Sequence, residues 1–186
     1  MKKAMVVLVL AAFTLPARAW DVATLMADLA RRHEDRARFV EKKTIALLDR
    51  PVVSSGELRF VAPDHLEKRT LLPKPGLLVI DGDLLTIERG ERKLSLRLSE
   101  QPGALALVDS LRGTLAGDLA ALKRSYKLTL SGDPKHWTLD LLPDDQRIAK
   151  FVVRITFGGS HDRVEWIRYL QADGDSSVMT IEPERP

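Results

Sequence analysis

The sequence predicts an α+β fold that is mostly antiparallel β, with about 11 strands in one strongly curved sheet or barrel. Short runs of alternating apolar and polar residues, such as residues 94–98 and 137–141, recur along the chain and are typical of half-buried strands. Gly, Pro and Asp separate these runs at the pace of hairpin turns, as at residues 81–83. Helical periodicity marks residues 21–34 and 103–124. An antiparallel sheet of this kind has one apolar face that must be covered, so what covers that face becomes the question of function.

The first helix is predicted over residues 21–34. Asp21 is a suitable N-cap, because its carboxylate can accept a hydrogen bond from a free amide of the first turn. Apolar side chains then follow at helical spacing on one face: Val22, Leu25, Met26 and Leu29. We expect this helix to pack on the outside or at the mouth of the sheet.

The first half of the chain is predicted to hold a long strand and then a meander of shorter ones. Residues 37–48 form the long strand, which we expect at an edge of the sheet or strongly twisted, because the charged residues 41–43 interrupt its apolar face. Residues 51–56 are expected to form a loop. Residues 77–80 are apolar on both faces, so they need cover from outside as well, for which the first helix is a candidate.

The second half is predicted to return to strands at residue 126. Turns are expected at residues 131–134, 158–159 and 172–175, and residues 178–181 should close the sheet. Period-2 alternation places the following side chains on one face: Phe151, Val153, Ile155 and Phe157. In the next strand, Val164, Trp166 and Arg168 should face one way and Glu165, Ile167 and Tyr169 the other.

The helical stretch from residue 103 to 124 carries one continuous apolar stripe. Its members are Leu105, Val108, Leu111, Leu115, Leu119 and Leu122. Gly113 and Gly117 interrupt the stripe, each at a cost of about 1 kcal/mol relative to Ala in a helix. We therefore expect two short helices joined near these glycines, which form either a hinged lid or a helix pair resting on the sheet.

Residues 1–19 have the pattern of a secretory signal peptide. Lys2 and Lys3 precede a mostly apolar run, and Ala17-Arg18-Ala19 is a small-residue cleavage site. We expect cleavage after Ala19, which leaves residues 20–186 as a single soluble domain. No Cys follows the site, so we expect no attached lipid, and zero Cys in the sequence excludes disulfides and thiolate metal sites.

The formal net charge of +3 gives no support for a nucleic-acid partner. Lys2, Lys3 and Arg18 account for 3 of the 29 basic residues and would leave with the signal peptide, so 26 basic residues would remain against 26 acidic ones. A formally neutral chain has no basic footprint for nucleic acid.

No pattern for catalysis, cofactor binding or metal binding stands out. The sequence has neither a nucleophile elbow nor a Gly-rich phosphate loop, and its four His residues lack metal-ligand spacing. The Asp-Gly-Asp segments 81–83 and 173–175 favour hairpins over calcium loops, because neither continues with enough oxygen ligands. We therefore expect no enzyme, no catalytic residue, no cofactor and no metal site. A hydrolase is the least favoured alternative, since no nucleophile and base can be paired by spacing.

Several motifs occur in an order that resembles one family. Gly56-Glu57-Leu58 leads to Phe60 and Ala62-Pro63, and a strand then leads to Ile80-Asp81-Gly82-Asp83 and Leu85. Later segments fit the same order: residues 116–118 before 126–128, residues 139–143, and the turn at 173–174. Over most of the chain after residue 19, this order and spacing resemble the periplasmic outer-membrane lipoprotein carriers of the LolA/LolB-like family. One position departs from the pattern, because the carriers have an Arg-Pro pair whose Arg helps to latch a helical lid, and Ala62 stands in its place.

The resemblance implies an open, incomplete β-barrel with a helical lid, the N-terminal helix and an apolar cavity. It also implies a monomeric periplasmic carrier that binds the acyl part of a lipoprotein or lipid. The carrier would take its cargo from an inner-membrane transporter to an outer-membrane acceptor. The cavity wall would be formed by inward-facing residues of the strands: Leu58, Phe60, Leu85, Ile87, Leu94, Leu96, Leu128, Leu130, Trp137, Leu139, Val153 and Ile155. The apolar stripe from Leu105 to Leu122 would form the lid.

Two questions stay open at this point. The same inward residues could form a packed core instead of a cavity, and the sequence names neither cargo nor donor. Because Ala62 replaces the latch Arg, a specialised paralogue that moves another lipid or acyl product is as good an interpretation as the housekeeping carrier. The alternative function is a periplasmic sensor or scaffold domain of the same fold that binds a partner protein or a mislocalised lipoprotein.

Overall fold

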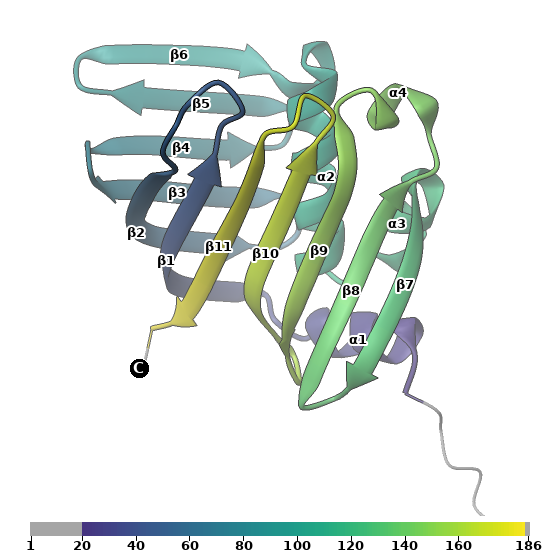
Figure 1. Cartoon of the computed structure of the whole chain (residues 1–186). Coiled ribbons are helices and arrows are strands. Elements are labelled where there is room, and N and C mark those ends of the chain that lie inside the picture. Colours follow the sequence, from purple (N-terminus) through teal and green to yellow (C-terminus); the bar gives the residue numbers. More distant parts are fainter. Residues whose placement is uncertain (1–19, 185–186) are drawn as a thin grey trace, which may run out of the picture.

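The structure, a computed structural model, describes residues 20–184, so the expected signal peptide lies outside it. Eleven antiparallel strands form one sheet in the order β6-β5-β4-β3-β2-β1-β11-β10-β9-β8-β7 (Figure 1). The outermost strands, β6 and β7, do not pair with each other, so the predicted open, curved sheet is confirmed.

The strands are β1 (Glu34–Thr44), β2 (Val52–Val61), β3 (His65–Leu72), β4 (Gly76–Asp81), β5 (Leu84–Arg89), β6 (Arg92–Arg97), β7 (Tyr126–Asp133), β8 (His136–Pro143), β9 (Val152–Ser160), β10 (Arg163–Gln171) and β11 (Ser176–Pro183). The helices are α1 (Val22–Leu29), the 3-10 turn η1 (Leu98–Glu100), α2 (Pro102–Leu115), α3 (Leu119–Ser125) and α4 (Gln146–Ala149).

The sheet consists of two wings that meet at β1 and β11. Strands β1 to β6 follow one another outward in chain order, and β7 to β11 return from the opposite edge until β11 pairs with β1. In Figure 1 the strands of the first wing run almost across those of the second, so the sheet curves around a concave inner face. The strand β11 therefore joins the two wings and does not close a barrel.

The expectation that the first strand lies at an edge is wrong, because β1 is central. Two of the charged residues that suggested an edge have partners on neighbouring segments. Glu41 forms an ion pair with Lys68 of β3, and Lys43 lies 3.6 Å from Asp175. The expected loop at residues 51–56 is also wrong: the β1–β2 ladder continues to the pair Lys43 and Val52, so β2 starts there.

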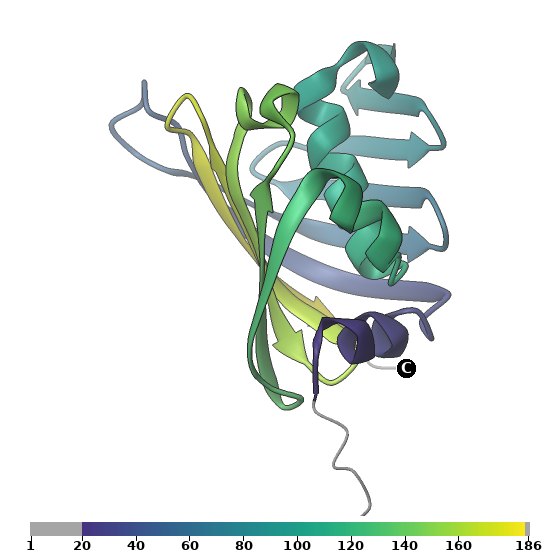
Figure 2. The same ribbon diagram turned by 90° about the vertical axis from the view of Figure 1, so that its right-hand side faces the viewer.

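The helices cover the inner face of the sheet. Figure 2 shows α2 and α3 lying across this face, with α1 at one end of the sheet. Asp21 caps α1 as predicted, with its carboxylate accepting from the Thr24 amide at 2.8 Å. The expected cover of residues 77–80 by the first helix is wrong: α2 packs on their inner face, where Ile80 and Leu85 form a buried cluster with Val108, and the outward Leu77 and Val79 stay half-buried.

The larger core lies in the second wing. Strands β7 to β10 pack against α1, α3 and part of α2 through buried side chains: Leu25, Met26, Leu29, Ala106, Leu122, Tyr126, Trp137, Leu139, Leu141, Val152, Ile155, Phe157 and Tyr169. The first wing has the much smaller cluster around Ile80 and Val108. The second wing thus has far more buried side chains than the first, and the space under the helices lies next to the first wing.

Two β-bulges change the expected alternation in β9 and β10. The register skips Val153, since Arg154 pairs with Leu170 and Val152 with Gln171, so a bulge leaves one extra residue in β9. Val152 and Ile155 are consequently buried, whereas Val153 is 46% exposed, and its expected inward direction is wrong. A second skip in β10 puts Val164 on the cavity side with Ile167 and Tyr169, contrary to the predicted alternation.

The expected turn at residues 158–159 is wrong, because both glycines lie inside β9. A Cβ built on Gly158 would lie 2.0 Å from the indole of Trp166, and one on Gly159 would lie 2.6 Å from Trp137. These glycines are required where tryptophan rings lie against the backbone. The turn itself follows at His161 and Asp162.

Candidate functional site

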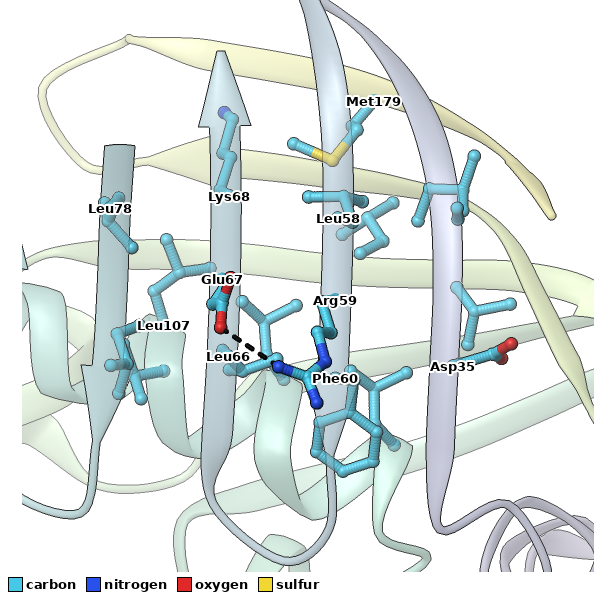
Figure 3. A pocket seen from close by; sticks show the side chains of 18 of the residues that line it. Asp35, Leu58, Arg59, Phe60, Leu66, Glu67, Lys68, Leu78, Leu107 and Met179 are labelled. Atoms are coloured by element: carbon cyan, nitrogen blue, oxygen red, sulfur yellow. Dashed lines mark hydrogen bonds and ion pairs between the residues drawn. The ribbon is translucent and has the colours of Figure 1, made fainter. Parts of the chain in front are cut away.

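A cavity of about 320 Å³ lies between α2 and the inner face of the sheet (Figure 3). Its volume is at the lower end of the roughly 300–1,000 Å³ of ligand pockets. The sheet contributes mostly apolar side chains from both wings: Ala37, Leu58, Phe60, Leu66, Leu78, Ile80, Leu85, Val164, Ile167, Tyr169, Met179 and Ile181. Leu29 and Arg32, at and just after the end of α1, border one end of the cavity.

The strand register explains why these residues meet. Antiparallel pairing sets them in two rows across the first wing, and each row faces inward because side chains alternate along every strand. One row is Ala37, Leu58, Lys68, Leu78, Ile87 and Leu94. The next row is Asp35, Phe60, Leu66, Ile80, Leu85 and Leu96. The cavity lies over the first four members of these rows, and over Leu85.

The opposite wall is one face of α2. It contributes residues at steps of three and four, as expected for one helical face: Ala104, Leu107, Val108, Leu111 and Leu115. The predicted apolar stripe is therefore divided among three environments. Val108, Leu111 and Leu115 line the cavity, and Leu105 packs on the small cluster beside it. Leu119 and Leu122 of α3 pack into the large core.

The two glycines of the helical pair serve close packing. Gly113 is buried within α2, and a Cβ there would lie 2.7 Å from Cδ2 of Leu122 in α3. Gly117 has a φ of +67° at the break between the helices, and its Cβ would lie 2.2 Å from the carbonyl oxygen of Met26 in α1. The joint between α2 and α3 therefore lies at Gly117, and Gly113 allows α3 to approach.

Polar groups on α2 are incompletely satisfied. The Tyr126 hydroxyl donates to the carbonyl of Ala106 at 2.8 Å, and burial raises the pKa of this hydroxyl far above its ordinary value. Arg112 Nη2 donates to the carbonyl of Gly82 in the β4–β5 turn at 2.5 Å. Among the described residues, however, neither Arg112 Nε nor Thr114 Oγ1 has a hydrogen-bond partner, although both atoms are buried. Burial also raises the pKa of Asp109, against the opposing charges of Arg112 and Arg124.

Two groups of charges border the apolar space from inside. Lys68 pairs with Glu41, and its Nζ lies 4.7 Å from the centre of the Phe39 ring. At the end near α1, Arg32 lies 3.2 Å from Asp35 and 3.0 Å from Asp162.

Other charged residues belong to the strands that form the cavity wall, but their side chains point to the outer face of the sheet. Arg59 pairs with Glu67 at 3.4 Å (Figure 3) and with Glu34 at 3.1 Å. A hydrogen bond from His65, at 2.8 Å, holds the pKa of Glu67 below its ordinary value. This network lies on the outer face of β1 to β3, because Arg59 alternates with Leu58 and Phe60.

The twelve residues predicted to form the cavity wall are distributed over several environments. Leu58, Phe60 and Leu85 line the cavity. Trp137, Leu139 and Ile155 are fully buried in the large core, against which Leu128 and Leu130 also pack. Ile87 packs against the small cluster, and Leu96 is half-buried in the edge strand β6. Leu94 is 52% exposed, and Val153 faces outward as described above.

Several cavity residues were not predicted. They come from β3, β4, β10 and β11: Leu66, Leu78, Ile80, Val164, Ile167, Met179 and Ile181. The alternation of Met179 and Ile181 with Thr180 was a usable signal for an inward face. The alternation does not, however, tell which inward face borders an empty space.

Two other features are absent from the described residues, a metal-binding cluster and a helix that could span a membrane. Between Trp20 and Glu184, no three His, Asp or Glu side chains come together in a way that could hold a metal ion. In the same part of the chain, every helix is too short or too polar to cross a bilayer.

Comparisons with known proteins place the chain in a family. The structure aligns with a LolA superfamily protein from Nitrosomonas europaea over 90% of this chain and 95% of that one, at 10% identity and a TM-score of 0.48. A DUF1329 family protein from Desulfovibrio piger aligns over 87% and 88%, at 11% identity and a TM-score of 0.48. A chain of the MucA/MucB complex of Pseudomonas aeruginosa aligns over 87% of this chain and 56% of that one, at 18% identity and a TM-score of 0.48.

Family membership depends on the sequence, because structural scores of this size carry no argument by themselves. No curated protein sequence matches the chain. The family described as "Outer membrane lipoprotein carrier protein LolA-like" matches residues 14–181, which is most of the sequence. The chain therefore belongs to the LolA-like family of outer-membrane lipoprotein carriers.

Proposed function

We propose that this protein is a periplasmic carrier that holds an acyl chain in the cavity beneath α2 and shuttles it from the inner to the outer membrane. The cargo is the acyl part of a lipoprotein or another lipid, received from an inner-membrane transporter and passed to an outer-membrane acceptor. The observation that carries the proposal is the partly open, mostly apolar cavity between α2 and the sheet, in a chain of this family. Aliphatic walls suit an acyl chain, because each buried methylene contributes about 0.8 kcal/mol without directional demands.

In this proposal α2 is the lid. It covers the cavity by one apolar face, and its polar contacts add little to the closed state. The hydrogen bond from Arg112 to Gly82 is worth about 1.5–3 kcal/mol, but the buried Nε without a partner costs about 1–3 kcal/mol. The buried hydroxyl of Thr114, which also lacks a partner, adds a further cost on the same helix. Closure then depends mainly on apolar contact, at about 25 cal/mol per Å² covered, which a bound acyl chain can replace.

The size of the cavity limits the cargo of the closed form. A volume of about 320 Å³ suits a single small amphiphile, so a cargo with several acyl chains requires α2 to move away from the sheet. Ala62 also stands where the resemblance implies a latch Arg, and Arg112 supplies a contact of a different kind from the lid side. Both features favour a specialised paralogue over the housekeeping carrier.

The test compares acyl-chain binding by two neighbouring variants. Leu78→Gln places an amide in the cavity wall, whereas Leu77→Gln changes the same strand on its other face. We expect Leu78→Gln to weaken the binding of a fluorescent fatty acid about tenfold, because a polar group without partners in an apolar wall costs roughly 1–3 kcal/mol. Leu77→Gln should bind like the wild type. Equal binding by all three folded proteins would mean that the cavity is not the site.

Native mass spectrometry of protein purified from the periplasm identifies the cargo class. We expect an acylated molecule to be retained in gentle ionisation. A bound peptide or protein in its place would favour the alternative function of a sensor or scaffold domain.

A further inference from the structure

A lysine interrupts the apolar inner face of the first wing. In the register, Lys68 lies between Leu58 of β2 and Leu78 of β4, both of which line the cavity. Its ammonium group lies 4.7 Å from the centre of the Phe39 ring and pairs with Glu41 of β1. A charged pair in an apolar wall is costly unless its members hold each other. The pair therefore needs an explanation beyond packing, because two aliphatic residues would fill the same space.

The ammonium group of Lys68 has unused binding capacity. An ammonium group has three N–H donors, and within the described chain the ion-pair partner of Lys68 is Glu41 alone. Its side chain is 26% exposed, compared with 17% for Glu41, so the cation is the more accessible member. Its long stem also allows the charge to move along the wall.

We propose that Lys68 binds the anionic head of a single-chain amphiphile whose tail lies along Leu58, Phe60 and Leu78. This inference deepens the proposed function and rests on it. The head is a carboxylate or a phosphate monoester, which accepts charge-assisted hydrogen bonds from the ammonium group. Glu41 holds Lys68 in place when the cavity is empty, and it lowers the affinity for an anion because the two negative groups then share one cation.

Four single-chain probes of equal tail length test this head-group site: dodecanoic acid, dodecyl phosphate, dodecanol and dodecylamine, each below its micelle concentration. Their affinities are measured by displacement of a neutral fluorescent lipid. We expect the two anions to bind about tenfold or more tightly than dodecanol, as one charge-assisted hydrogen bond provides. Tighter binding of the phosphate points to a phospholipid-like head and tighter binding of the carboxylate to a fatty acid.

Variants then assign the preference to Lys68. Lys68→Met should remove the advantage of the two anions over dodecanol, whereas Arg69→Met, one residue along β3 on the other face, should leave that advantage intact. Glu41→Gln should strengthen anion binding. The double variant Lys68→Met with Glu41→Gln leaves no unpaired charge, so it reports on the same preference if Lys68→Met alone fails to fold.

The results separate this inference from the proposed function. Binding of all four probes with equal affinity, or preference for dodecylamine, overturns the role of Lys68 and leaves the carrier function standing. An anion preference that survives in the folded double variant also overturns the role of Lys68 and leaves the carrier function standing. Failure of every probe to bind overturns the carrier function together with the head-group site.

Discussion

Gly113→Ala tests whether Gly113 serves close packing or acts as a hinge, because the two roles predict opposite changes in stability. If Gly113 served only as a flexible point in a helix, Gly113→Ala would stabilise the protein by about 1 kcal/mol through helix propensity. In the structure the added methyl group would lie 2.7 Å from Cδ2 and 3.0 Å from Cγ of Leu122, which is fully buried. Overpacking of this kind costs about 1–3 kcal/mol.

The two effects leave a net loss on the order of 1 kcal/mol, because the clash exceeds the propensity gain for most of its range. For a chain of this size, that loss lowers Tm by about 2–4 °C. We expect circular dichroism melting to show this decrease for Gly113→Ala, without any change of fold.

A double-mutant cycle with Leu122→Ala provides the control. Removing the Leu122 branch frees the space above Gly113, so Gly113→Ala should be stabilising by about 1 kcal/mol in that background. The reasoning is refuted if Gly113→Ala raises Tm in the wild-type background, or if its effect has the same sign in both.

Other predictions concern α2 and its surroundings. Tyr126→Phe removes the hydrogen bond to the Ala106 carbonyl and should cost about 0.5–1.5 kcal/mol in urea unfolding, the net contribution of one hydrogen bond, because this carbonyl also lies within the hydrogen-bonded helix α2. Asp109→Asn should stabilise the protein slightly at neutral pH, because partial desolvation raises the pKa of this carboxyl above its ordinary 3.8 and so penalises its charged form, while the exposure of the residue to solvent keeps the gain small. With a raised folded pKa, the Asp109 protein regains stability as pH falls through that value and has regained it fully below 3.8. The advantage of Asp109→Asn should therefore vanish in acid, and an advantage that grows on acidification would contradict the assignment.

The strand pattern was predictable, but the neighbours of β1 were not. Alternation and Asp-Gly turns predict about 11 antiparallel strands, and residues 20–184 form 11. The charged residues of the first strand indicated an edge, because a sequence does not show that Glu41 will meet Lys68, 27 residues later. Pairing across such separations depends on the register of β2 and β3, which is fixed only in the folded sheet.

Bulges limited the prediction of side-chain direction. Val153 follows the same apolar alternation as Ile155 in the sequence, but one extra residue in β9 turns it outward. The glycines at 158 and 159 resembled a turn for a related reason, since the tryptophan rings that exclude a Cβ come from other strands. In both places a tertiary contact overrides the local pattern.

The distinction between core and cavity was not available from the sequence. Phe60 and Leu139 occupy equivalent inward positions on alternating strands, yet Phe60 lines the cavity and Leu139 is packed in the core. The difference arises because α1 and α3 fill the second wing, whereas α2 spans the first wing and leaves space beneath it. Helix placement of this kind depends on the close approaches at Gly113 and Gly117.

Photo-crosslinking of a bound fatty acid is the most direct test of the claim that the cavity beneath α2 holds an acyl chain. Dodecanoic acid with a diazirine at its tail end would be irradiated with the protein, and labelled peptides would be mapped by mass spectrometry, with unlabelled acid as competitor. The account predicts competable labels on α2 at Leu107 or Leu111 and on the facing strands at Phe60 or Leu78. Labels confined to exposed apolar residues outside the cavity, such as Val40 and Val178, or labels that unlabelled acid does not reduce, would contradict it.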